Sequence, residues 1–262
     1  IVLDPVGCHA GAYRLSVVLD LLKTGDISLL RGNQSEIKAI YDALSPNNQI
    51  DTSTTGKGVD GVQVEDSAVM TYRLARLINC PVVATGEEDY VSDGTRIFAV
   101  PHGHPIMTAV TGTGCLLGAV LAAFFSAYQP CKNTLSIGEF LAYALAYYGL
   151  AGESAVQVSG VKPGSFGVDF MDSLYTLDDT MLVSENRIRP IVVPDQLQVY
   201  FVCGTQDTGL NKKRLLEIVE EACRGDVTCF QFREKGGGTL EGQQKLELAQ
   251  QLQHICAKYD VL

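Results

Sequence analysis

Short apolar runs alternate with helical patterns through the first 85 residues, and this alternation constrains the fold more than any other feature. Apolar runs predict strands at Ile1–Leu3, Ser28–Leu30 and Pro81–Thr85. Between them, apolar residues recur three and four apart, which predicts helices near Leu15–Leu22, Gln34–Leu44 and Ser67–Ile78. Parallel strands need such crossover connections. The pattern therefore predicts an α/β fold, with a mostly parallel sheet and helices on both of its faces.

A hairpin and a long helical region follow these strands. The dipeptide Asp93-Gly94 lies between two short apolar runs and is typical of tight hairpin turns, so we expect antiparallel strands at the sheet edge. From Gly114 to Tyr175 the pattern is helical. Residues 181–197 lose this periodicity and contain two prolines, which is typical of a linker. The first domain is therefore expected to span residues 1–180.

A second domain is predicted over residues 198–262. Strands at Gln198–Val202 and Thr228–Phe232 alternate with helices at Lys212–Arg224 and Glu241–Lys258. This βαβα order is the opening part of a larger parallel fold. We expect the later strands of that fold to be missing from the chain.

Composition excludes several classes of function. The net charge of −10 argues against a nucleic-acid binder or a protein of acidic membrane surfaces. No apolar run reaches the roughly 18 residues needed to span a bilayer. The 8 cysteines are scattered without a Cys-x-x-Cys pair, which is typical of reduced thiols in a cytoplasmic protein.

A glycine loop, Val110–Cys115, directly precedes an apolar helix. Gly112 and Gly114 let the backbone approach an anion closely, and the first amides of a helix point unpaired N–H groups at it. With Thr113 between them, these residues are candidates for an anion hole. Glycines before a helix are common, however, so helix capping alone is an equal interpretation.

Two named phosphate motifs compete for this loop. The Walker pattern does not fit, because no Lys-Ser or Lys-Thr pair follows the glycines. Gly112, Gly114 and Gly118 come nearer to the dinucleotide fingerprint, but the preceding segment, Pro101–Pro105, does not have a strand pattern. A dinucleotide-dependent oxidoreductase therefore remains an alternative, and it predicts that NAD(H) protects the protein against heating.

Cys115 is the candidate catalytic residue of the loop. A thiol in the first turn of a helix lies near the helix amides, which favour its thiolate form, so it could act as a base or a nucleophile. The alternative is a small buried side chain that only packs.

A second cluster, Arg31–Glu36, follows the second predicted strand. Asn33 is a natural helix N-cap, and Glu36 has the spacing of a capping-box partner. In the functional interpretation, Arg31 contacts a phosphate, and Glu36 and Asp4 lie near a hydrated Mg²⁺. Thr85 ends the third strand at the same edge of the sheet, where open α/β sheets bind ligands.

Five motifs in order carry a resemblance to a known family. They are Asp4-Pro5-Val6-Gly7, Arg31-Gly32-Asn33-x-x-Glu36, Thr85-Gly86-Glu87-x-Asp89, Val110-Thr111-Gly112-Thr113-Gly114-Cys115 and Gly164-Ser165-Phe166. Together they resemble hydroxyethylthiazole kinase of the ribokinase-like superfamily, over roughly residues 1–180.

The resemblance implies phosphorylation of the alcohol of 4-methyl-5-(2-hydroxyethyl)thiazole by ATP and Mg²⁺, in thiamine salvage. Arg31 and Thr85 would then contact ATP, and Gly112 would contact the substrate. Cys115 would stand where sugar kinases of the superfamily place an aspartate base. Asp4 and Glu36 would serve the metal. The family's substrate sites lie at trimer interfaces, so a homotrimer is expected.

One departure from the family pattern bears on activity. Family members carry a substantial N-terminal segment that supplies thiazole-binding residues, and no such segment precedes Ile1 in this sequence. We therefore expect part of the alcohol pocket to be missing. The alternative to an active kinase is a chain that binds nucleotide or oligomerises without turnover.

The tail carries a resemblance of its own. Gln231, Arg233 and Lys235 alternate along an extended segment, so they share a face. An ordinary charged strand end would look the same. The pattern resembles the Gln-x-Arg-x-Lys of thiamine-phosphate synthase, a TIM barrel that grips a pyrimidine diphosphate and joins it to thiazole phosphate. A bifunctional parent follows from the two resemblances, of which this chain would carry only the opening of the barrel.

Overall fold

The computed structural model describes residues 1–45, 63–129, 131, 134–236, 240–259 and 261–262, in two units, Ile1–Ile191 and Val192–Leu262. The first unit contains β1 (Val2–Leu3), α1 (Ala12–Lys23), β2 (Leu29–Asn33), α2 (Gln34–Leu44), α3 (Gln63–Ile78), β3 (Val82–Thr85), β4 (Asp89–Ser92), β5 (Ile97–Val100), α4 (Thr113–Ala127), α5 (Ile137–Ser159), α6 (Pro163–Thr176), α7 (Asp179–Ser184) and β6 (Arg189–Ile191). The second contains β7 (Tyr200–Cys203), α8 (Lys212–Arg224), β8 (Cys229–Phe232) and α9 (Gly242–Lys258).

One sheet of the order β1-β2-β3-β4-β5-β6 organises the first unit. β1, β2 and β3 pair in parallel, and the pairings from β3 to β6 are antiparallel. The predicted α/β architecture is confirmed, and so is the hairpin around Asp93-Gly94. The sheet is parallel where the candidate site residues lie.

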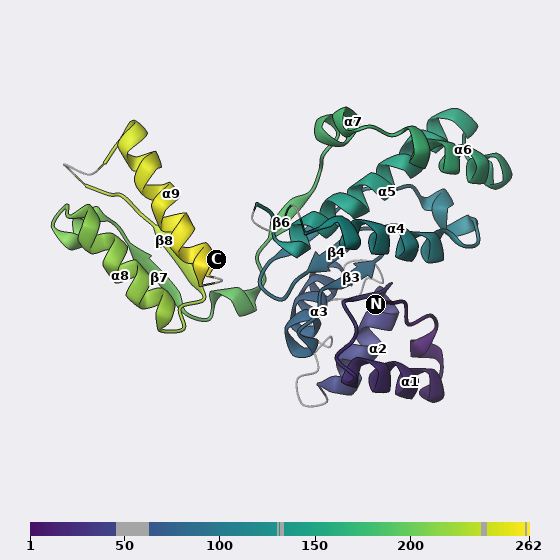
Figure 1. Ribbon diagram of the computed structural model, residues 1–262, viewed down its shortest axis with the longest axis horizontal. Helices are drawn as coiled ribbons and strands as arrows, with labels where there is room; N and C mark the ends of the chain where they lie inside the picture. The colour runs from purple at the N-terminus through teal and green to yellow at the C-terminus, as the bar shows by residue number, and fades with distance from the viewer. Residues whose placement is uncertain (46–62, 130, 132–133, 237–239, 260) are drawn as a thin grey trace. The chain divides into compact units, whose positions relative to one another are not determined.

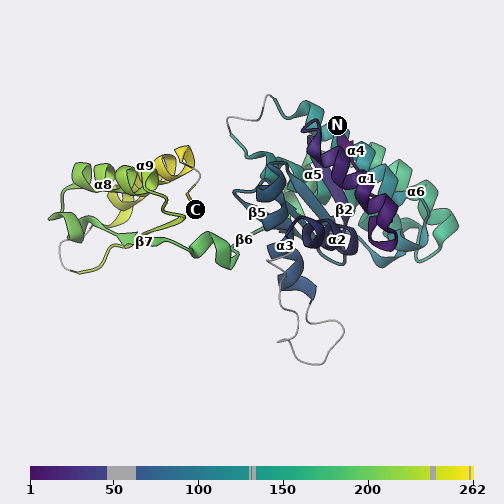
Figure 2. The ribbon, with the colours of Figure 1, turned by 90° about the horizontal axis from the view of Figure 1, so that it is seen from below.

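Helices cover both faces of this sheet (Figure 1). Leu29, Val83 and Val91 belong to a buried core that the sheet shares with α4, α5 and α6. The alternate strand residues, such as Leu30 and Val82, are equally buried on the opposite face, where α2 and α3 pack. Figure 2 shows that second face from below. Because both faces are covered, consecutive residues of a strand can both be apolar, as in β5 and most of β3.

Two predicted segments differ in the structure. The helical region from Gly114 to Tyr175 is three helices. Gly160, whose φ of 63° favours glycine, ends α5, and a proline starts α6. The segment 181–197, expected as a linker, begins inside helix α7 and contains the edge strand β6. Pro190 argued against a strand in the sequence, because proline cannot donate a backbone hydrogen bond. An edge strand tolerates proline, since one of its sides needs no ladder hydrogen bonds.

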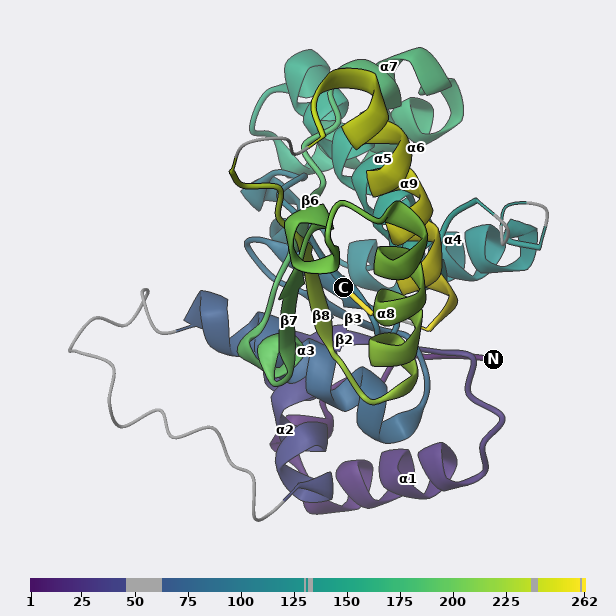
Figure 3. The same ribbon diagram turned by 90° about the vertical axis from the view of Figure 1, so that its left-hand side faces the viewer.

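The second unit is the predicted βαβα arrangement. β7 and β8 pair in parallel, with Tyr200 aligned to Cys229, and α8 and α9 pack against the pair (Figure 3). Leu215, Val219, Leu248 and Leu252 form the core of this unit. Among the helices that the structure describes, none is both long enough and apolar enough to cross a membrane.

Candidate active site

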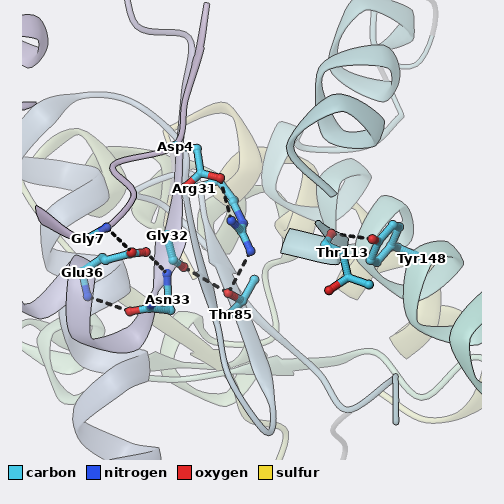
Figure 4. Close-up of polar contacts among 9 residues, drawn as sticks. All are labelled: Asp4, Gly7, Arg31, Gly32, Asn33, Glu36, Thr85, Thr113 and Tyr148. Carbon is cyan, nitrogen blue, oxygen red and sulfur yellow. Dashed lines mark hydrogen bonds and ion pairs between the residues drawn. The ribbon is translucent and has the colours of Figure 1, made fainter. Parts of the chain in front are cut away.

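Three side chains at the carboxyl ends of the parallel strands lie in one row. The register aligns Arg31 of β2 with Val83 of β3, and β1 runs alongside β2 on its other edge. Side chains two residues apart on a strand share a face. This register brings Asp4, Arg31 and Thr85 together on the face that α4 and α5 cover (Figure 4). Arg31 is a residue of β2 itself, rather than of the loop after it as the sequence predicted.

The Arg31 guanidinium joins the row. Its Nη1 donates to Asp4 Oδ2 at 2.8 Å, and its Nη2 donates to Thr85 Oγ1 at 3.3 Å. The Thr85 hydroxyl donates in turn to the Gly32 carbonyl at 3.3 Å. The Arg31 side chain is 10% exposed and that of Asp4 21%, so water screens this ion pair only weakly.

Two buried atoms of this ion pair have no hydrogen-bond partner among the described residues, namely Asp4 Oδ1 and Arg31 Nε. Leaving a buried donor or acceptor unpaired costs about 1–3 kcal/mol. Burial also raises the pKa of Asp4, although the Arg31 charge beside it favours the carboxylate. Asp4 Oδ1 can therefore accept one further hydrogen bond, and Arg31 Nε can donate one, to a bound molecule.

Both carboxylate oxygens of Glu36 accept hydrogen bonds from backbone amides. Oε2 accepts from the Asn33 N–H at 2.7 Å, and the Asn33 side chain accepts from the Glu36 N–H at 2.9 Å, which completes a capping box. Oε1 accepts from the Gly7 N–H at 2.8 Å, on the loop that follows Asp4. The capping interpretation accounts for these contacts. Glu36 thereby ties the loop that carries Asp4 to the start of α2.

The glycine loop forms the start of α4. Gly112 is the N-cap residue, and its φ of 98° is a conformation that favours glycine. Thr113 closes the preceding turn, since its hydroxyl contacts the carbonyls of Met107 at 2.8 Å and Val110 at 3.1 Å. No side chain caps the helix, and within the described residues the N–H groups of Gly114 and Cys115 donate to no oxygen. These two amides are free for an anion.

Gly114 brings this loop to the strand ends. A Cβ at this position would lie 3.3 Å from Arg31 Nη2, so the guanidinium lies directly against the loop backbone. The structure thus unites the Asp4–Arg31–Thr85 row with the helix start. Cys115 is exposed in the same first turn, while its neighbours Leu116 and Leu117 pack into the core. An exposed thiol adds little to packing, so the interpretation as a buried filler does not fit.

Asp89 lies next to the candidate site, and the sequence offered no reason to assign it a role. Its Oδ1 accepts from the Gly86 N–H at 3.0 Å, next to Thr85. Burial raises the pKa of Asp89 to about 7, although this amide and the charge of Arg31 oppose the shift. The motif that contains Asp89 could have revealed the turn, because aspartate commonly bonds its own loop backbone.

No cluster of three or more histidine, cysteine or acidic side chains suited to a metal occurs among the described residues. Mg²⁺ in phosphoryl-transfer sites is commonly held by one or two carboxylates together with substrate phosphates, so such a cluster is not required. The unpaired Oδ1 of Asp4 fits this use. Glu36 fits it less well, because both of its oxygens already serve backbone amides.

The candidate residues of the second unit lie on an open segment that begins in β8, at Gln231, and continues past the end of the strand. Gln231, Arg233 and Lys235 are exposed, and they alternate with the less exposed Phe232 and Glu234, as predicted for one shared face.

Glu234 anchors this segment. Its carboxylate accepts from the Thr205 N–H at 2.6 Å, the Thr205 hydroxyl at 2.7 Å and the Leu240 N–H at 3.1 Å. Burial favours the neutral form, but these bonds outweigh it and lower the pKa of Glu234. A Cβ on Gly204 would lie only 2.1 Å from the Arg233 carbonyl, so the two strand ends meet backbone to backbone.

Fold and site together define a class, the α/β proteins that hold phosphate groups between strand ends and the start of a helix. Comparison with known proteins identifies the family. Residues 1–180 match the model of the hydroxyethylthiazole kinase family, and residues 199–262 match that of thiamine monophosphate synthase. The chain belongs to the hydroxyethylthiazole kinase family.

Individual relatives agree with this assignment. A hydroxyethylthiazole kinase of Streptococcus agalactiae is 40% identical over 186 residues, which cover 71% of this chain and 68% of that protein. One of Pyrococcus horikoshii is 36% identical over 191 residues, covering 73% of this chain and 66% of that protein. The solved structure of hydroxyethylthiazole kinase from Pyrococcus horikoshii OT3 matches with a TM-score of 0.60 at 33% identity, over 73% of this chain and 65% of that one. The chain spans about two thirds of the length of these relatives.

Proposed function

We propose that this protein transfers the terminal phosphoryl group of ATP to the alcohol of 4-methyl-5-(2-hydroxyethyl)thiazole, in thiamine biosynthesis or salvage. The names of the relatives supply the acceptor. The observation that carries the proposal is the convergence of Arg31, with its partners Asp4 and Thr85, on the free amides of Gly114 and Cys115.

The chemistry follows from these groups. The bond between the terminal phosphorus of ATP and its bridging oxygen breaks, a bond to the alcohol oxygen forms, and ADP leaves. Negative charge on the transferred group is stabilised by the free loop amides and the Arg31 guanidinium. The thiolate form of Cys115 is assigned as the base that accepts the alcohol proton and becomes a thiol, since its sulfur is exposed at the same helix start. Gly112 is assigned to the substrate side and Thr85 to the nucleotide.

Mg²⁺ is assigned to Asp4 through the unpaired Oδ1, where it would neutralise phosphate charge. The contacts of Glu36 support an indirect role, in which it positions the loop that carries Asp4.

The second unit extends the proposal to a bifunctional parent that also joins thiazole phosphate to hydroxymethylpyrimidine diphosphate. Gln231, Arg233 and Lys235 are assigned to the diphosphate, because they are exposed on one segment, with Gln231 in β8 and the two cations beyond its end. Guanidinium and ammonium groups suit this anion. The product of the first reaction would then be a substrate of the second.

A trimer and a cytoplasmic location complete the proposal. All 8 cysteines are unpaired, which is usual in the reducing cytoplasm. Two helices present apolar side chains to solvent, which supports self-association. On α1 and α6 respectively, these are Tyr13, Val17 and Leu21, and Val168, Met171 and Tyr175.

The test compares two acceptors in the full-length protein, with ADP release as the readout. The thiazole alcohol should give sustained ADP formation, and 4-methyl-5-ethylthiazole, which lacks the hydroxyl, should give only the background rate. Equal rates with both compounds would mean that the alcohol is not the acceptor. Adding hydroxymethylpyrimidine diphosphate should then yield thiamine phosphate, detected by mass spectrometry.

A further inference from the structure

The side chain of Tyr148 on α5 is buried against the start of α4. Its hydroxyl donates to the Thr113 carbonyl at 2.5 Å (Figure 4), and its ring meets Phe170 edge-on, with centroids 5.0 Å apart. Only 4% of the residue is exposed. The ring is therefore fixed by packing, and the hydroxyl reaches the glycine loop from a rigid helix.

The hydrogen bond from Tyr148 to the Thr113 carbonyl also orients the N–H of Gly114, because both groups belong to the same peptide unit. The Thr113 carbonyl and the Gly114 N–H belong to one planar trans unit and point in opposite directions. Holding the carbonyl therefore sets the direction of the N–H. This N–H is one of the free amides of the loop, and its residue, Gly114, lies against the Arg31 guanidinium.

The rest of α5 is packed tightly enough to serve as a support. A Cβ on Gly149 would lie 2.5 Å from His102 Cβ, and one on Gly152 would lie 2.6 Å from Met107 Sδ. These glycines let α5 approach the segment that leads into the loop. Burial raises the pKa of Tyr148, so its hydroxyl stays a donor across the working pH range of the protein.

We propose that Tyr148 is a positioning residue for phosphoryl transfer, which aims the Gly114 N–H at the transferred group by holding the Thr113 carbonyl. The inference rests on the proposed kinase function. Pre-aimed donors stabilise the charge of a transition state without reorganisation, so the hydroxyl acts on the chemical step more than on substrate binding.

The test is Tyr148→Phe, which removes only the hydroxyl, in the full-length protein. The matched control is Tyr147→Phe, because Tyr147 is the adjacent residue of α5 and its hydroxyl donates to the Leu174 carbonyl, away from the loop. We expect Tyr148→Phe to lower kcat about 5- to 20-fold, with the KM for ATP and for the alcohol within about twofold of wild type. Tyr147→Phe should leave kcat unchanged.

A second measurement does not depend on turnover. The ¹⁵N order parameters of Gly114 and Cys115 should fall from about 0.85 toward 0.6 in Tyr148→Phe and stay unchanged in Tyr147→Phe. Unchanged kcat in Tyr148→Phe, or an equal loss in both variants, would overturn the inference. If the wild type itself turned over no alcohol, the proposed function would fail, and unchanged order parameters would then refute the positioning role separately.

Discussion

Each of the two units contains a glutamate whose carboxylate joins two segments by accepting their backbone N–H groups. The cations near these two glutamates differ. Glu36 accepts backbone N–H groups from Gly7 and Asn33, and Glu234 accepts them from Thr205 and Leu240. Each carboxylate thus ties a strand end to a neighbouring segment.

The cations beside these glutamates differ in burial and pairing. Arg31 is buried and paired with Asp4, whereas Arg233 and Lys235 are exposed and form no ion pair with other described residues. The first unit therefore holds its charge in a fixed position before any ligand arrives, since packing and Asp4 restrain the guanidinium. In the second unit, the cations must be ordered at the moment of binding, at an entropic cost. This difference predicts that mutation of Arg31 affects catalysis and stability together, while mutation of Arg233 or Lys235 affects binding alone.

The largest effect is expected from Cys115→Ala. A general base contributes about 10²- to 10⁴-fold, so kcat should fall by that factor, while the melting temperature changes by less than about 2 °C because the thiol is exposed. The control is Cys80→Ala, which removes a buried thiol and should lower the melting temperature without affecting kcat. If Cys115→Ala gave the behaviour expected of Cys80→Ala, the thiol would only pack.

Arg31→Gln and Arg233→Gln test the contrast between the units directly. Arg31→Gln leaves Asp4 buried without its cation, so the free energy of unfolding should fall by about 2–4 kcal/mol, and kcat/KM about 100-fold. Arg233→Gln should change stability by less than about 0.5 kcal/mol and leave the kinase rate intact. Chemical denaturation and steady-state kinetics check both. Equal losses of stability in the two variants would contradict the view that Arg31 is held in place by packing and pairing while Arg233 is not.

Glu36→Gln and Glu234→Gln test the feature that the units share. Each change turns an acceptor of backbone N–H groups partly into a donor, and should cost about 1–3 kcal/mol of unfolding free energy. For Glu36→Gln the loss should be the same with and without EDTA, because its oxygens serve amides. A loss that appears only in the presence of Mg²⁺ would make Glu36 a metal ligand instead.

The last prediction concerns pH. The folded pKa of Asp89 is about 7, above its ordinary value of 3.8, so the folded state holds this proton more tightly than the unfolded state. Its contribution to stability is present below pH 3.8 and is lost as the pH rises toward 7. Asp89→Asn keeps an oxygen for the Gly86 N–H and removes this loss. Its melting temperature should therefore exceed that of wild type by a margin that grows from pH 4 to pH 8. A constant margin would contradict the raised pKa.

Much of the first unit was predictable because its causes are local. Apolar runs fixed the strands, and the spacing of Asn33 and Glu36 predicted the capping box. The gathering of Asp4, Arg31 and Thr85 followed from parallel strands ending at one edge. The contacts themselves were not predictable, since Asp4 and Arg31 are 27 residues apart and Thr113 and Tyr148 are 35 apart. Such pairs depend on register and helix packing, which no local pattern encodes.

The central claim is that the site formed by the strand ends and the glycine loop phosphorylates the thiazole alcohol. The most direct measurement is ³¹P NMR of the full-length protein with Mg·ATP and 4-methyl-5-(2-hydroxyethyl)thiazole. A phosphomonoester resonance should grow at the rate at which the terminal phosphate of ATP disappears, and this conversion should be nearly absent in Cys115→Ala. Inorganic phosphate as the only product, or no consumption of ATP, would contradict the claim.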